Sequence, residues 1–344
     1  GTHLAKMLSG NGHELTVVDV DSKALAEIDG LVDVVTVEGD TTQFSGLRKS
    51  GVRKCDLFIA VRSVENDNIL SAVVAKQMGA KKAIARVDSS EYLEPNSKEV
   101  FIDMGIDYIF YPEHIAAREV INLLGHTSTT EYVEFSGGKL SLIAFRLELT
   151  SPLLGTQVID KNLDEDIDYR TVAIVRGSQT IIPKPDDHYE EGDMVYVIVR
   201  NNATQRVLEQ SGRNEVTIRN MMILGGSRIG VRIASELQND VNVKLVDYNA
   251  EKAFRLAEFL DKTLIINEDG RDTEAMLEED IAGMDAFVAV TGRSETNILA
   301  AMLAKRMGVK KVIAEVENIN YISLAESIGV DTIINKKFIT ASNI

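Results

Sequence analysis

The stretch DLFIAVRSVENDNILSAVVAKQMGAKKAIARV, residues 56–87, returns later in the chain as DAFVAVTGRSETNILAAMLAKRMGVKKVIAEV, residues 285–316. The two stretches align without a gap at an offset of 229 residues, and 17 of their 32 positions are identical. Shared composition does not produce such agreement, so the chain contains a duplicated domain. Each copy of the stretch reads as an apolar strand, a helix and a second apolar strand.

The same alternation continues along the rest of the second copy. The predicted strands are 221–224, 243–246, 263–266, 286–290 and 311–315. The predicted helices are 229–238, 250–259, 272–278 and 295–307. The strands are continuous apolar runs, which is typical of parallel strands that are covered on both faces. The pattern therefore predicts a doubly wound, parallel, Rossmann-like sheet in each copy.

The middle of the chain does not show this alternation of strands and helices. Between about 129 and 200, short β-like runs are separated by turns rich in Gly, Pro and Asp, and a polar stretch follows them. We predict an α/β protein with two Rossmann-like domains, 1–127 and 217–344, separated by a small α+β domain at 128–212. An acidic run at 164–168 either binds a hard cation or forms a solvated face.

The ends of the two copies do not coincide with the ends of the chain. Gly1 aligns with Gly230, which in the second copy follows a strand and a glycine turn. Ile344 aligns with Val120, inside a helix that the first copy continues. We therefore expect the sequence to be a fragment of a longer protein that is truncated at both ends, with the missing strand and turn ahead of Gly1.

Composition excludes several classes of function. The net charge of −16 argues against a nucleic-acid partner, because a phosphate backbone would repel the protein. Hydrophobic content of 44% and charged content of 26% are typical of globular proteins. The single cysteine, Cys55, rules out an internal disulfide framework and suits a reducing cytoplasm.

A glycine turn follows the first strand of the second copy and precedes a helix. Its residues are Gly225, Gly226, Ser227, Arg228, Ile229 and Gly230. Backbone N–H groups in such a turn can approach a pyrophosphate at the helix N-terminus. Ser227 occupies the second glycine position of the usual G-x-G-x-x-G pattern, and the turn can also serve packing alone.

An aspartate ends the second strand of each copy, Asp19 in the first and Asp247 in the second. A carboxylate at this place accepts hydrogen bonds from ribose hydroxyls and repels a 2′-phosphate. The cofactor prediction is therefore NAD(H), with ATP or ADP as the second possibility, over NADP(H). The alternative is that both aspartates cap the helices that follow them.

Further candidate ligand residues follow the other strands. They are Gly39, Asp40 and Thr41 at an adenine edge, Val61 and Arg62, Arg86 and Val87, the helix-start residue Gly1, and Asp269 in the second copy. Arg62 and Arg86 either neutralise phosphate or form surface ion pairs. Asn68 and Asn297 match between the copies and either cap the next helix or contact the ligand.

No catalytic set accompanies these signals. A dehydrogenase needs a proton donor beside the nicotinamide, and none of the five histidines lies in a recognisable catalytic motif. No nucleophile elbow and no Cys/His metal spacing is present in the sequence. We therefore predict a nucleotide sensor and not an enzyme; an NAD-dependent oxidoreductase and a nucleotide-free assembly scaffold are the alternatives.

The motifs together resemble the RCK domain, which regulates potassium channels and transporters. The resemblance rests on VVDVD at 17–21, EGDTT at 38–42 and the repeated stretch, and in the middle domain on SPLLGTQV, RTVAIVRG and EGDMVYVIV. The domain order is similar to that of the TrkA family, the TrkA-N/TrkA-C regulatory subunits of bacterial Trk potassium uptake. The resemblance covers nearly the whole chain.

The resemblance implies a function and partners. Members of the family lie in the cytoplasm at the inner face of the cell membrane, bind NAD(H) or ATP/ADP, and gate a TrkH- or TrkG-like potassium transporter. They self-associate through their nucleotide domains, from dimers to tetrameric rings. The helix at about 113–124 would be the crossover helix that pairs nucleotide domains.

Overall fold

The computed structural model describes residues 1–158, 169–177, 179–213 and 216–344. The acidic run at 164–168 lies outside these ranges. Contacts divide the chain into two compact units, one of residues 1–116 with 335–344 and the other of residues 117–334. In the described part of the chain, no helix is both long and apolar enough to cross a membrane.

The second unit contains a six-stranded parallel sheet in the order β13-β12-β11-β14-β15-β16. Its strands are β11 (Asn220–Leu224), β12 (Asn242–Val246), β13 (Leu264–Ile266), β14 (Ala286–Ala289), β15 (Lys311–Glu315) and β16 (Thr332–Ile334). Its helices are α9 (Arg228–Leu237), α10 (Ala250–Phe259), α11 (Thr273–Glu278), α12 (Ser294–Arg306) and α13 (Ile322–Ser327). The five predicted strands are confirmed to within a residue or two, and β16 adds a sixth.

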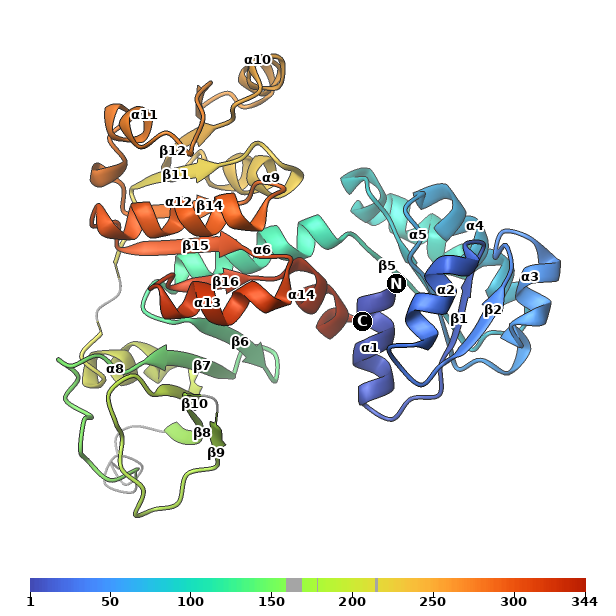
Figure 1. Cartoon of the computed structure of the whole chain (residues 1–344), viewed down its shortest axis with the longest axis horizontal. Helices are drawn as coiled ribbons and strands as arrows, with labels where there is room; N and C mark the ends of the chain where they lie inside the picture. Colours follow the sequence, from blue (N-terminus) through green and yellow to red (C-terminus); the bar gives the residue numbers. More distant parts are fainter. Residues whose placement is uncertain (159–168, 178, 214–215) are drawn as a thin grey trace. The chain divides into compact units, whose positions relative to one another are not determined.

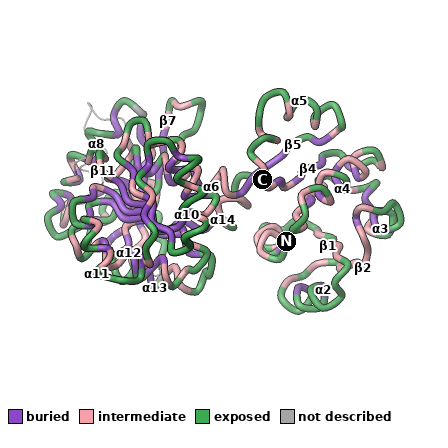
Figure 2. The backbone as a smooth tube through the Cα atoms, turned by 90° about the horizontal axis from the view of Figure 1, so that it is seen from above, coloured by how far each residue is buried: buried purple, intermediate pink, exposed green. Residues whose placement is uncertain are grey.

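Burial on both faces explains why the strands of this sheet are continuously apolar. All four residues of β14 are buried, and Phe287 at its centre has no exposed surface. Figure 2 shows the central strands as the buried middle of this domain. Removing an aromatic side chain of this size from water contributes roughly 1.5–3 kcal/mol, so the sheet core is a main source of stability.

The small domain lies in the same unit and is an antiparallel sheet in the order β6-β7-β10-β8-β9. Its elements are β6 (Glu131–Phe135), β7 (Leu140–Arg146), β8 (Tyr169–Arg176), β9 (Gln179–Ile181), β10 (Met194–Arg200) and α8 (Thr204–Gln210). Val195, Val197 and Val199 alternate inward along β10, as expected for a sheet with one covered face. The guanidinium of Arg176 bonds both carboxylate oxygens of the buried Asp193, each at 2.8 Å, and fixes the turn before β10.

The first unit repeats the nucleotide-domain pattern in two smaller parallel sheets, β1–β2 and β3–β4–β5. Its strands are β1 (Thr16–Asp19), β2 (Val35–Glu38), β3 (Leu57–Ala60), β4 (Lys82–Arg86) and β5 (Tyr108–Phe110), and its helices are α1 (Thr2–Gly10), α2 (Ser22–Asp29), α3 (Phe44–Lys49), α4 (Glu65–Met78) and α5 (Pro95–Asp103). Among the described residues of this unit, no strand pairs with both β1 and β3 in the way that β11 pairs with β12 and β14 in the second copy. Accordingly Leu57 on β3 is 38% exposed, whereas its counterpart Ala286 is fully buried.

The last helix of each copy is grouped with the other copy. The helix α6 (Pro112–Gly125) begins in the first unit, and its residues from Ala117 onward belong to the second. The helix α14 (Lys336–Asn343) belongs by sequence to the second copy but lies beside α1 in the first unit (Figure 1). The division therefore falls within the final helix of the first copy and just before the final helix of the second.

Candidate nucleotide-binding sites

The first candidate site lies where the parallel strands of the first unit end. Asp19 is the last residue of β1, and its carboxylate accepts a hydrogen bond from the backbone N–H of Asp21 at 3.0 Å. Asp21, and not Asp19, caps α2 through the N–H groups of Lys23 and Ala24. The capping alternative for Asp19 is therefore wrong, and its half-buried carboxylate stands at the strand end where a ribose acceptor is placed.

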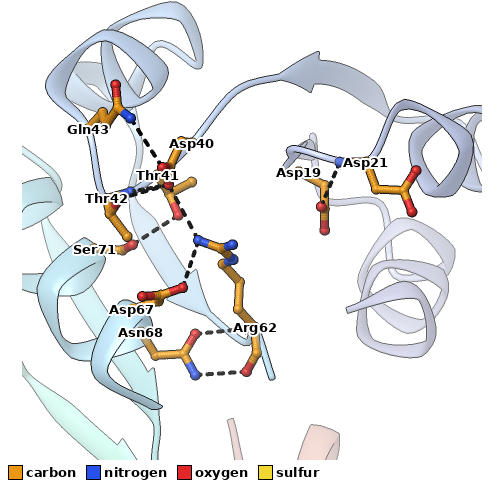
Figure 3. Close-up of polar contacts among 10 residues, drawn as sticks. All are labelled: Asp19, Asp21, Asp40, Thr41, Thr42, Gln43, Arg62, Asp67, Asn68 and Ser71. Atoms are coloured by element: carbon orange, nitrogen blue, oxygen red, sulfur yellow. Dashed lines mark hydrogen bonds and ion pairs between the residues drawn. The ribbon is translucent and has the colours of Figure 1, made fainter. Parts of the chain in front are cut away.

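Beyond the next strand, Asp40 and Arg62 face each other across the sheet edge (Figure 3). The Arg62 guanidinium lies 3.4 Å from Asp40 and 3.0 Å from Asp67, so this arginine forms ion pairs with both carboxylates. The backbone N–H of Thr42, its hydroxyl and the charge of Arg62 hold the pKa of Asp40 below its usual value. Asp40 is thus an ionised acceptor next to a positive charge in this structure.

An amide side chain connects the loops that follow β3 and β4. Asn68 is almost fully buried; its amide group donates to the carbonyl oxygens of Arg62 and Arg86, and its oxygen accepts from the Arg62 N–H at 2.7 Å. Asn297 makes the same contacts in the second copy with Thr291 and with the Glu315 carbonyl. Neither asparagine caps its helix, because the N-caps are Val64 and Arg293.

A close packing of glycines shapes the loop that carries Asp40. Gly39 lies against α3, and a methyl group on it would come within 3.2 Å of the Gly46 Cα atom. A methyl group on Gly46 would come within 2.7 Å of the Asp40 carbonyl carbon. Thr41 is buried behind them and accepts a hydrogen bond from the Ser71 hydroxyl at 2.9 Å. Sequence reasoning found Gly39, Asp40 and Thr41 but missed Gly46, which belongs to no motif.

We expect Gly46→Ala to displace this loop. The added methyl group overlaps backbone, which cannot rotate away as a side chain can, so the cost is roughly 1–3 kcal/mol of stability. Urea unfolding of the full chain measures the loss. Gly10→Ala is the matched control, because a methyl group there meets no atom within 4 Å. Equal stability of the two variants would contradict the packing argument.

The remaining candidate ligand residues of the first copy differ in their burial and in the groups that they already contact. Gly1 is the N-cap residue of α1. The Arg86 guanidinium forms an ion pair with Asp88 at 2.8 Å. Val61 is half-buried after β3, and Val87 is fully buried with its N–H bonded to the Phe110 carbonyl, so its side chain faces the core.

In the second copy, the glycine turn has the geometry that the sequence predicts. Gly225 adopts a left-handed conformation at φ +108°, and a methyl group on it would meet the Thr291 N–H at 2.9 Å. Ser227 caps α9, with its hydroxyl accepting from the Gly230 N–H at 3.3 Å. Ile229 and Gly230 are buried against the sheet, and Arg228 opens the helix. The turn thus serves both packing and helix capping.

The strand-end aspartate of the second copy, Asp247, already accepts hydrogen bonds from other groups of the chain. Asp247 is 4% exposed, and one of its oxygens accepts from the Gly226 N–H at 2.8 Å and from the Lys252 ammonium at 2.7 Å. The other oxygen accepts from the N–H of Asn249, which is the N-cap of α10. Burial works against ionisation, but these bonds still lower the pKa of Asp247. The helix-cap alternative is wrong for Asp247 as well.

Lys252 makes the two copies unequal. Aligning the caps Asp21 and Asn249 places Ala24 opposite Lys252, so Asp19 has no lysine at this position. The Lys252 side chain also lies over the glycine turn, within 3.2 Å of a methyl group placed on Gly226.

The carboxylate of Asp269, another candidate of the second copy, also accepts hydrogen bonds from a neighbouring basic side chain. Hydrogen bonds from Arg271, at 2.5 to 3.1 Å, hold its pKa at about 2.

Comparisons with known proteins agree with this architecture. The TrkA-N domain family matches residues 1–112 and 221–336, and the TrkA-C domain family matches residues 142–212. The Trk system potassium uptake protein TrkA of Halomonas elongata is 31% identical over 347 residues, covering 100% of this chain and 76% of that protein. The protein of the same name from Vibrio alginolyticus is also 31% identical, with 99% and 75% covered.

Solved structures share the fold at low identity. The GsuK channel bound to NAD superimposes with a TM-score of 0.70 at 16% identity, over 99% of this chain and 60% of that one. GsuK bound to ADP gives a TM-score of 0.60 at 14% identity, over 99% and 64%. The predicted architecture of two Rossmann-like domains around a small domain is confirmed. With the family matches covering most of the chain, this protein belongs to the TrkA family of Trk system potassium uptake proteins.

Proposed function

We propose that this protein is a nucleotide-sensing regulatory subunit of a Trk-type potassium uptake system. The observation that carries the proposal is the arrangement at the strand ends of the first domain. There the Asp19 carboxylate and the Asp40–Arg62 pair stand at the edge where Rossmann-like sheets bind nucleotides. NAD(H) or an adenine nucleotide fits this chemistry, because Asp19 would accept from ribose hydroxyls and repel a 2′-phosphate.

We assign nucleotide binding to the first domain rather than the second. A carboxylate can bind ribose hydroxyls only if its oxygens are released from other donors. Asp247 would have to give up the Lys252 ammonium, whereas Asp19 has Ala24 at the position that corresponds to Lys252. Lys252 therefore acts as an internal substitute for the ligand in the second domain.

The family to which the chain belongs indicates the class of its partner. Relatives carry the name of a potassium uptake system, so we propose a TrkH- or TrkG-like membrane transporter as partner and the inner face of the membrane as the location. Self-association through the nucleotide domains would build the assembly. A nucleotide does work in such a protein by binding two conformations with different affinity.

Equivalent substitutions in the two copies test the assignment. Asp19→Asn keeps the size of the side chain but removes its charge, and we expect the affinity for NADH to fall roughly 10- to 100-fold, as when a hydrogen bond to a charged group is lost. Asp247→Asn is the matched control and leaves the affinity unchanged. Calorimetric titration of the full chain measures both.

The same titrations identify the ligand. NADH, NAD, ATP, ADP and NADP are compared, and NADP is expected to bind most weakly. Binding by none of them would refute the sensing function, and an equal loss in both aspartate variants would refute the assignment to the first domain. Steady consumption of NADH with carbonyl substrates would favour an oxidoreductase instead.

A further inference from the structure

The Arg62 guanidinium of the first domain already has two acidic partners. Its Nη1 atom lies 3.0 Å from a carboxylate oxygen of Asp67 and 3.4 Å from one of Asp40 (Figure 3). The three side chains are 31–32% exposed, so water reaches both ion pairs and weakens them. The cation that stands at these strand ends is therefore held by the chain itself, but only loosely.

The two carboxylates are held in different ways. One oxygen of Asp40 accepts from the backbone N–H and the hydroxyl of Thr42, at 3.0 and 2.8 Å, and the other accepts from the Gln43 amide at 3.3 Å. These bonds fix Asp40 in the loop that follows β2. Asp67 lies in the first turn of α4, where the helix dipole stabilises a negative charge even without a cation beside it. Asp67 is therefore the partner that Arg62 can exchange at low cost.

The second copy of the repeat lacks both members of this ion pair. In the aligned stretch, Arg62 corresponds to Thr291 and Asp67 corresponds to Thr296. The buried asparagine that connects the two neighbouring loops is nevertheless present in both copies and makes the same contacts. The fold of these loops therefore does not need the ion pair. The pair belongs to the copy to which we assign nucleotide binding.

We propose that Asp67 is an internal competitor for the nucleotide phosphate, which holds Arg62 while the first site is empty and releases it when a phosphate binds. The inference rests on the proposed function, because it concerns the same site. The sequence left two interpretations of Arg62 open, phosphate binding and a surface ion pair. In this proposal they describe the bound and the empty form of one site.

The exchange gives the nucleotide a structural effect. A phosphate can replace the carboxylate because a guanidinium binds two of its oxygens through parallel, charge-assisted hydrogen bonds. Asp67 is carried by α4, which packs against β3 and β4. Release of Arg62 therefore removes a contact between the loop after β3 and the first turn of α4. The nucleotide then favours the conformation in which this contact is broken.

Removal of the competitor is expected to tighten phosphate binding. In the full chain, Asp67→Asn raises the affinity for ADP roughly two- to fivefold, which corresponds to the strength of a partly exposed ion pair. In a chain that also carries Arg62→Gln, Asp67→Asn gives no such gain, because the cation for which Asp67 competes is gone. Asp103→Asn removes an equal charge from the exposed end of α5 and leaves the ADP affinity unchanged. NMR titration of each chain with ADP measures these affinities, including weak ones.

Two results would overturn the inference and leave the proposed function standing. The first is an ADP affinity that Asp67→Asn leaves unchanged. The second is an equal gain with and without Arg62, because Asp67 would then act only by repelling the phosphate. An unsubstituted chain that binds neither ADP nor NADH would refute the proposed function itself.

Discussion

Asn68→Asp is expected to be among the most damaging single-atom changes in the first domain. The substitution replaces an amide nitrogen with an oxygen that would face the carbonyl oxygens of Arg62 and Arg86, now 2.9 and 3.0 Å from that nitrogen. Asn68 is 1% exposed, so water cannot compensate. Two lost hydrogen bonds and a buried, unpaired charge cost roughly 3–5 kcal/mol.

Unfolding in urea and amide exchange at Arg62 measure this effect. The Arg62 N–H is bonded to the Asn68 oxygen in the intact protein, so its exchange reports whether the loop stays in place. We expect Asn68→Ala to lose less, roughly 2 kcal/mol, because it adds no charge. Asn96→Asp introduces the same charge on the exposed surface of α5 and serves as the control. Equal stability of Asn68→Asp and Asn96→Asp would refute this role of Asn68.

A second large effect is expected from Lys311, which begins β15. Its side chain is 2% exposed, and its ammonium donates to the Thr129 carbonyl oxygen at 2.6 Å. Burial lowers its pKa from 10.5 to about 8, with smaller lowering from the charges of Arg213 and Lys305 and an opposing effect from Asp331. Keeping this lysine charged at neutral pH therefore costs on the order of 3 kcal/mol.

The direction of the pH dependence follows from proton binding. Between pH 8 and 10.5 the unfolded chain keeps a proton on Lys311 that the folded chain has released, so stability rises with pH across this range. Below pH 8 both states carry the proton, and this lysine causes no slope. We expect Lys311→Met to remove the rise and to stabilise the second unit at pH 7 by roughly 1–3 kcal/mol, less than the full cost because the Thr129 carbonyl loses its donor.

Urea unfolding at pH 7.5 and pH 10 checks this expectation. Lys82→Met is the matched control, because Lys82 holds the same position of the repeat on β4 but is exposed. A rise in stability that is unchanged in Lys311→Met would assign the pH dependence to other groups. A Lys311→Met variant that is less stable at pH 7 would show that the hydrogen bond to Thr129 outweighs the cost of burying the charge.

The positions of the two strand-end aspartates could be predicted from the sequence, but their contacts could not. Asp19 and Asp247 were recognisable because each ends a strand and precedes a capped helix, and both features are local. The Lys252 ammonium on Asp247 was not recognised, because a lysine in the first turn of a helix usually faces water. Only the packing of α10 against the glycine turn directs that side chain inward.

Gly46 and the position of α14 were not predicted, because both depend on contacts between segments that are distant in the sequence. Gly46 is needed where α3 touches the Asp40 backbone, and no motif records this approach. The helix α14 belongs by sequence to the second copy but lies in the unit of the first. An amphipathic helix shows that it will pack but not against which surface.

The repeated stretch at 56–87 and 285–316 therefore determined the fold without further help. Strand and helix periodicity, the duplicated offset and the strand-end aspartates are properties of neighbouring residues, so one sequence suffices to identify two Rossmann-like domains. The sequence already indicates that the two copies are unequal, but only the tertiary structure shows that the Lys252 ammonium bonds the Asp247 carboxylate, whereas Asp19 has no lysine at the corresponding position. These outcomes depend on contacts between segments that are distant in sequence, which local patterns do not encode.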